Sequence, residues 1–178
     1  MIRFGPSGIP LSCKGRTLRD GIEDVHNLGL TAMEVQLVRV NLVERYATEE
    51  DAGLTPRHLP NELVVQIGRR GDGSDLRITS LDAPIERGDV LHSLASGIAR
   101  DYAELEELGV IARELDIELS LHAPYYMDLA DADGLAAKSV DAVKWGGLLA
   151  DAMNARARSE ERRVGKECTS WCRSRWSP

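Results

Sequence analysis

The stretch IELSLHAPYYMDL, residues 117–129, begins with a strict alternation of apolar and polar side chains and then turns at a proline. The apolar residues of this alternation fall on one face of a predicted strand, and Glu118, Ser120 and His122 fall on the other. Pro124 directs the chain out of the sheet. The pattern therefore predicts a strand with a polar face that ends at His122.

A second segment shows the same division between its two faces. AMEVQLV, residues 32–38, also alternates, with Glu34 and Gln36 on its polar side. A helix that starts after Thr17 and stops at Gly29 precedes it, and IRFGP at residues 2–6 reads as a still earlier strand. Strand, helix and strand within 40 residues indicate a βαβ unit with parallel strands.

The remaining segments extend this order. Helical spacing of apolar residues predicts helices at about 98–115 and 135–153. Residues 41–60 look helical until Pro56 and Pro60 interrupt them. The segments 63–67 and 76–81 flank a turn-rich stretch and read as a β-hairpin, within an insertion at about 62–95.

The predicted fold class is α/β. Residues 1–157 should form the N-terminal part, about three βα units, of a (β/α)8 TIM barrel with an inserted β-hairpin. In such barrels one strand face points to the helices and the other to the barrel interior and mouth, where polar groups are tolerated. A fourth strand should follow at about residue 156, but the sequence changes character there.

Residues 158–178 contrast with the rest of the chain. They hold six basic and three acidic residues, which leaves 16 basic and 26 acidic residues in 1–157. The segment has no apolar period and carries Cys168 and Cys172, too few ligands for a zinc site. It resembles a vector-derived end, and we expect a non-native or disordered tail; a basic arm and a solvated native end are the other readings.

The composition limits the classes of function. The 178 residues carry a formal net charge of −7, which argues against broad electrostatic capture of nucleic acid but not against a local contact. No apolar run of about 18 residues is present, so no membrane partner is expected. The first residues show no secretory pattern, and a cytoplasmic location is expected.

His122 has two readings from the residues alone. A neutral imidazole at the carboxyl end of a strand is a common metal ligand, and it can equally be an interior histidine satisfied by hydrogen bonds. Tyr125 and Tyr126 follow it directly, and Arg39 follows the strand at 32–38.

The element LSLHAPYYMDL resembles the third-strand motif of the endonuclease IV family (AP endonuclease family 2), within the xylose isomerase-like TIM barrel superfamily. The pieces FGPSGIP, EVQLVR and KSVDAVKWGG are similar to the archaeal branch of that group. The likeness covers about residues 1–157 without the insertion.

This resemblance implies an eight-stranded barrel that binds three zinc ions and hydrolyses the DNA backbone 5′ to abasic sites. His122 would be a zinc ligand, and Tyr125 and Tyr126 would reach into the DNA beside the flipped-out site. Arg39 would contact DNA, and no catalytic residue is assigned. One imidazole cannot hold a catalytic zinc, which needs at least three protein ligands. The resemblance thus implies an N-terminal fragment, inactive alone and monomeric.

Two other functions stay open at this stage. The chain could be a fragment of a metal-dependent sugar isomerase or epimerase with the same barrel, or a non-enzymatic interaction module. The tyrosine pair favours the endonuclease over the isomerase. The net negative charge weighs mildly against DNA as the partner.

Overall fold

The computed structural model describes residues 2–37, 41–71, 75–124, 127, 129, 134–155 and 157–159. It is an α/β structure with three helices and two sheets in the described part of the chain. None of these helices combines the length and apolar character that crossing a membrane requires.

The first sheet is parallel and follows the order β1-β6-β7. Its strands are β1 (Ala32–Gln36), β6 (Glu118–His122) and β7 (Ala157–Ser159). The strand predictions for the two alternating segments are confirmed. The fourth strand expected at about residue 156 is present as the short β7, and it overlaps the first residues of the segment that we read as a tail.

The first residues of the chain lie along the free edge of β1. They were expected to form a strand at 2–6, and they make only a single bridge, between Ser7 and Glu34. The Phe4 carbonyl accepts hydrogen bonds from the amides that start β1, and the Pro6 carbonyl accepts one from Glu34 N at 3.0 Å. The segment is therefore parallel to β1 and occupies the place of a first strand, although prolines and glycines interrupt its pairing.

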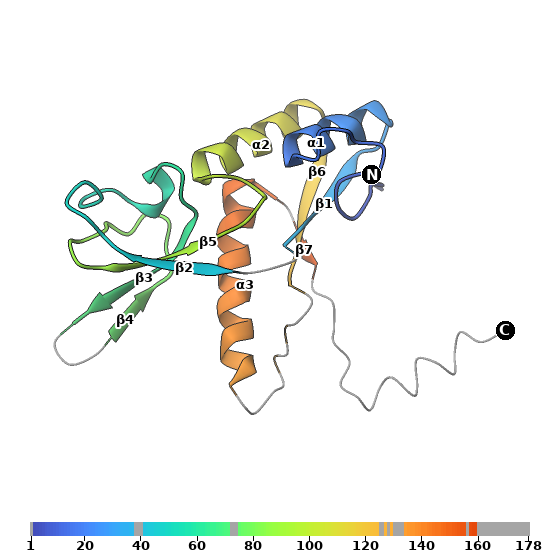
Figure 1. The fold of residues 1–178 in the computed structure, drawn as a ribbon. Helices are drawn as coiled ribbons and strands as arrows, with labels where there is room; N and C mark the ends of the chain where they lie inside the picture. The colour runs from blue at the N-terminus through green and yellow to red at the C-terminus, as the bar shows by residue number, and fades with distance from the viewer. Residues whose placement is uncertain are drawn as a thin grey trace, which may run out of the picture.

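All three helices pack on the apolar face of the parallel sheet. These helices are α1 (Leu18–Asn27), α2 (Tyr102–Glu114) and α3 (Leu135–Ala152). Figure 1 shows α1 and α2 side by side above β1 and β6, with α3 standing next to them. Met33 and Leu121, on the apolar face, belong to the same buried cluster as Leu149 of α3. The capping box predicted from the sequence is present, because Thr17 and Asp20 bond reciprocally.

The insertion is larger than a hairpin. It forms a four-stranded antiparallel sheet of order β2-β5-β3-β4, with a 3₁₀ turn between β2 and β3. Its elements are β2 (Leu42–Tyr46), η1 (Pro56–His58), β3 (Val64–Arg70), β4 (Asp75–Ile78) and β5 (Val90–Leu94).

The predicted hairpin is confirmed as β3–β4, but the helical reading of the residues before Pro56 is wrong. Residues 42–46 form β2, since Val43 and Tyr46 favour an extended chain and β5 supplies a partner for the whole segment. The insertion therefore begins at β2, about 20 residues earlier than we predicted.

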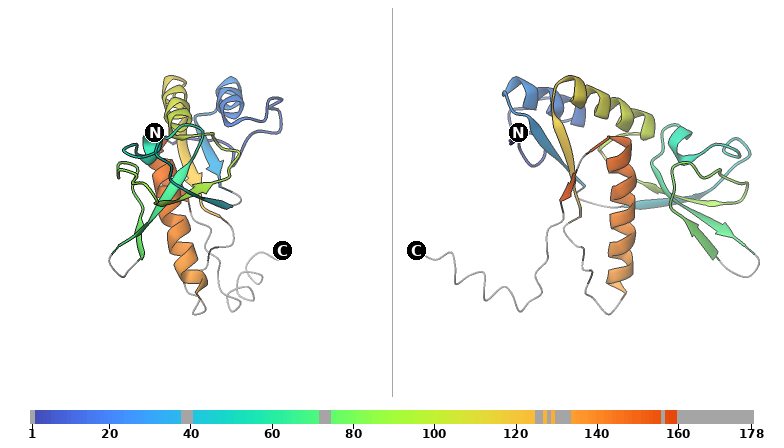
Figure 2. Two further views of the ribbon diagram at one scale, coloured as in Figure 1. Left: turned by 60° about the vertical axis from the view of Figure 1, so that its left-hand side comes forward. Right: turned by 180° about the vertical axis from the view of Figure 1, so that it is seen from behind.

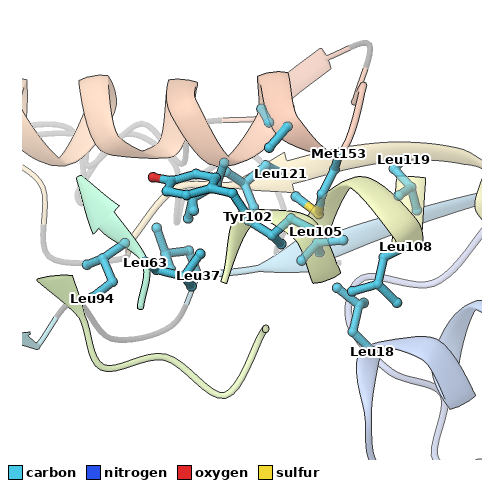
Figure 3. Packing of buried hydrophobic residues seen from close by; sticks show 14 of the residues in the cluster. Leu18, Leu37, Leu63, Leu94, Tyr102, Leu105, Leu108, Leu119, Leu121 and Met153 are labelled. Carbon is cyan, nitrogen blue, oxygen red and sulfur yellow. The ribbon is translucent and has the colours of Figure 1, made fainter. Parts of the chain in front are cut away.

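Tyr102 joins the two sheets. Its ring is fully buried in the main core, which Figure 3 shows with Leu37, Leu63 and Leu121 close by. Its hydroxyl donates a hydrogen bond of 3.1 Å to the Val64 carbonyl of β3. Burial raises the pKa of this phenol far above its ordinary value, so the hydroxyl remains a donor at every physiological pH.

A charge network connects β2 to the following segments of the inserted unit. The Arg45 guanidinium donates to both carboxylate oxygens of Asp51, at 2.6 and 3.0 Å, and to Glu62 at 2.6 Å. Thr48 adds its amide and hydroxyl to Asp51. These donors favour the ionised carboxylate, and Arg45 foremost holds the pKa of Asp51 well below its usual range.

Replacing Gly109 with alanine should destabilise the fold. A Cβ atom there would lie 2.3 Å from the Met153 carbonyl oxygen at the end of α3, so α2 and α3 would have to separate. We expect a loss of about 1–3 kcal/mol in the free energy of unfolding, measured with urea. Gly97→Ala is the control, because its Cβ would meet nothing within 4 Å. Equal stability of the two variants would contradict the packing described.

The Arg45–Asp51 pair makes the free energy of unfolding depend on pH. Because the folded pKa of Asp51 is depressed, its contribution is complete above the unfolded pKa of about 4 and is lost as pH falls toward the folded value. Asp51→Asn should cost about 2–3 kcal/mol at pH 7, and much less at pH 2. Urea unfolding at both pH values measures this, and a cost independent of pH would contradict the assignment.

Candidate functional site

The carboxyl ends of β1 and β6 bring the polar residues of both strands together. The two strands are parallel and in register, so Glu34 is paired with Ser120 and Gln36 with His122. Glu34, Gln36 and Ser120 are partly exposed, on the face opposite the helices. The division of faces predicted from the sequence is thus confirmed in both strands. We call Ser7, Glu34, Gln36, Ser120 and His122 the polar row.

Ser7 extends the polar row beyond β1. Its hydroxyl donates to Glu34 Oε2 and accepts a hydrogen bond of 3.0 Å from Gln36 Nε2. The following glycine, Gly8, has a φ of +89°, and a Cβ there would approach the Gln36 amide at 3.3 Å. Gly8 therefore lets the N-terminal segment turn closely over the end of β1, which fixes both polar side chains.

His122 is held in one orientation. The residue is 6% exposed, and its Nδ1 lies 2.6 Å from the carbonyl oxygen of Ala123. A carbonyl can only accept, so Nδ1 carries the hydrogen. In the neutral ring this leaves the lone pair on Nε2, the tautomer in which an imidazole accepts a hydrogen bond or binds a metal.

The other residues predicted to form the site lie outside the described residues. This applies to Arg39, Tyr125 and Tyr126. Their predicted contacts with DNA stay predictions.

The described residues do not fit a zinc ion by themselves. No group of three or more His, Cys, Asp or Glu side chains that could hold a metal occurs in the described part of the chain. The residue opposite His122 on β1 is Gln36, an amide. The carboxylate Glu34 lies two residues before Gln36, opposite Ser120. A catalytic zinc needs three protein ligands, so no metal-dependent step can be assigned to these side chains.

A cavity of about 470 Å³ shares one residue, Gln36, with the polar row, and Met33 and Val35 of the apolar face of β1 also line it. It lies at the end of β1, between the N-terminal segment and the chain that leaves β5, and Gln36, Asn41 and Ser96 give it polar groups. Apolar side chains such as Ile9 and Leu37 form much of the remaining wall. Its size and mixed character are typical of a site for a small polar ligand or part of a larger one.

The sequence analysis missed Ser7, Asn41 and Ser96 as members of this region. Glu34 and Gln36 were placed on the polar face but given no role. The sequence did contain a signal for Glu34 and Gln36. Two parallel strands with the same alternation of polar and apolar residues should bring their polar side chains together on one face. No local pattern indicated that the N-terminal segment would fold over them.

Comparisons with protein-family models, with curated proteins and with solved structures gave no match for this chain.

The hydrogen bond to Ala123 predicts a single tautomer for His122. A long-range ¹H–¹⁵N spectrum of the neutral ring should show a protonated Nδ1 and an unprotonated Nε2, since the carbonyl requires a donor. A spectrum with the hydrogen on Nε2 would contradict the orientation of the ring. His122→Ala identifies the signal by its loss.

Proposed function

We propose that this chain is the N-terminal part of an endonuclease IV-like enzyme that hydrolyses DNA 5′ to abasic sites. The observation that carries the proposal is His122, which is nearly buried at the carboxyl end of β6 and is the first residue of the HAPYY stretch that resembles the family. The wider proposal is a (β/α)8 barrel, of which the N-terminal segment, β1, β6 and β7 would be the first four strands.

The order of these segments supports the barrel proposal. Each parallel segment lies next to the one that precedes it in the parallel series, and the helices lie on one face only. A closed barrel requires both features, because its helices surround the sheet and its interior receives the other face. The inserted sheet interrupts the series between β1 and α2 and does not change its order.

The residues of this chain would act in binding and positioning. The tautomer of His122 makes Nε2 its acceptor atom, and Gln36 and Ser7 place amide and hydroxyl groups at the same edge. An abasic nucleotide exposes a sugar and two phosphates, which such groups recognise by hydrogen bonds. Because the net charge is −7, attraction to DNA must be local.

A sugar isomerase or epimerase of the same superfamily is the second candidate. The observation in its favour is the chemistry of the polar row, where a carboxylate, an amide and a hydroxyl are linked by hydrogen bonds. Such a set suits the hydroxyl groups of a free sugar, and the acidic chain poses no obstacle to a neutral substrate.

The test begins with the genomic DNA downstream of codon 157. We expect the reading frame of the parent gene to continue into further strand–helix units, with histidines and carboxylates at the strand ends. The protein from that longer frame should nick abasic-site DNA. His122→Ala should lower the rate of nicking by at least about 100-fold, because the loss of a direct ligand should cost more than the loss of a residue that only orients a ligand. His58→Ala, in the inserted unit, is the matched control.

The 178-residue chain alone should not nick this DNA, with or without zinc, because His122 has no group of two further metal-binding side chains beside it among the described residues. Zinc-dependent nicking by the chain alone would contradict that expectation. The frame could instead continue with many carboxylates, and its product could convert sugars and leave abasic DNA intact. That result would contradict the endonuclease proposal and support the isomerase.

A further inference from the structure

A cavity of about 340 Å³ lies between the inserted sheet and α3. Figures 1 and 2 show that α3 stands between the two sheets, with the parallel strands on one side and the inserted strands on the other. None of the residues of the polar row lines this cavity. The cavity is therefore separate from the proposed DNA site. Its volume falls within the range of small-molecule sites.

The first wall of the cavity is a polar line across the inserted sheet. The strand registers pair Glu44 with His92 and His92 with Gln66, and all three side chains line the cavity. Gln66 is 5% exposed, which is unusual for an amide on a sheet. Arg77 of β4 lies opposite Gly68, in the neighbouring row of the sheet, where the missing side chain of Gly68 leaves room for the His92 ring.

The second wall belongs to α3. Lys138, Asp141 and Trp145 line the cavity, at spacings that place them on one side of the helix. The indole N–H of Trp145 is buried, and no described residue accepts a hydrogen bond from it. A buried donor without an acceptor is rare in folded proteins, and the indole that carries this one forms part of the cavity wall.

Two cations, Arg77 and Lys138, and two carboxylates, Glu44 and Asp141, line the cavity. Arg77 is exposed and lies 3.6 Å from Asp141, which also faces Lys144 at 3.7 Å. Within the described part of the chain, Lys138 is in no ion pair. Glu44 is engaged by His92, whose Nδ1 lies 3.2 Å from its carboxylate. Among the described residues, both carboxylates of the lining are therefore engaged, and Lys138 is the cation that remains to attract an anion.

We propose that this cavity binds a small organic anion, with an apolar body that carries one carboxylate or phosphate group. Arg77 and Lys138 hold the charged group, and Leu42, Ala142 and the Trp145 ring contact the apolar body. The Gln66 amide and the Trp145 indole supply donors to further oxygen atoms. A cavity filled only by water is the competing explanation, and it predicts no selectivity for charge.

Trp145 provides the readout. The chain holds three tryptophans, and replacing Trp171 and Trp176 with phenylalanine leaves Trp145 as the only one. We expect benzoate or phenyl phosphate to change its fluorescence saturably, with a dissociation constant of about 1 mM or below. Neutral benzamide, of similar shape, should bind at least about tenfold more weakly than benzoate. Whichever of benzoate and phenyl phosphate has the lower dissociation constant shows whether the cavity prefers a carboxylate or a phosphate.

Variants separate the proposed contacts from general effects. Arg77→Ala and Lys138→Ala should each weaken anion binding by at least about fivefold. Arg87→Ala is the matched control, an equally exposed arginine of the inserted unit that pairs with Glu49. Trp145→Phe, measured by calorimetry, should weaken binding through the loss of the N–H group. The proposal is overturned if benzamide binds as well as benzoate, if neither anion saturates, or if both cation variants bind like the control.

Discussion

The parallel ladder between β1 and β6 is the contact on which the rest of the structure depends. It pairs residues 32–36 with residues 118–122, across more than 80 residues of chain, and its register decides which side chains meet. A shift by one residue would place the polar side chains against the helices and the apolar ones on the open face. The core under α1, α2 and α3 and the polar row on the other face therefore arise from the same pairing.

The inserted sheet is tied to this framework from two directions. Tyr102 of α2 reaches the backbone of β3 from the main core, and α3 faces the inserted strands with its polar side. The sheet also has a small core of its own, which includes Val64, Ile67 and Leu91. This arrangement explains why an insertion of about 50 residues leaves the order of the parallel strands intact, and why a cavity with polar walls lies where the two units meet.

The sequence predicted the features that have a local cause. Alternation predicted β1 and β6 and the side on which His122 lies, and helical spacing with the Thr17 cap predicted the helices. It failed at residues 42–46, where pairing with β5 decides an extended conformation that the local pattern did not show. Ser7 was missed for a related reason, because its contact with Glu34 depends on how the N-terminal segment folds back.

The most direct test of the account is a map of contacts between backbone protons of β1 and β6 by nuclear Overhauser spectroscopy. The account predicts a parallel pattern in which Val35 is opposite Leu121 and Gln36 is opposite His122. An antiparallel pattern, a register moved by one residue, or contacts from β6 to the inserted strands would contradict it. Any of these results would separate His122 from Gln36 and remove the candidate site.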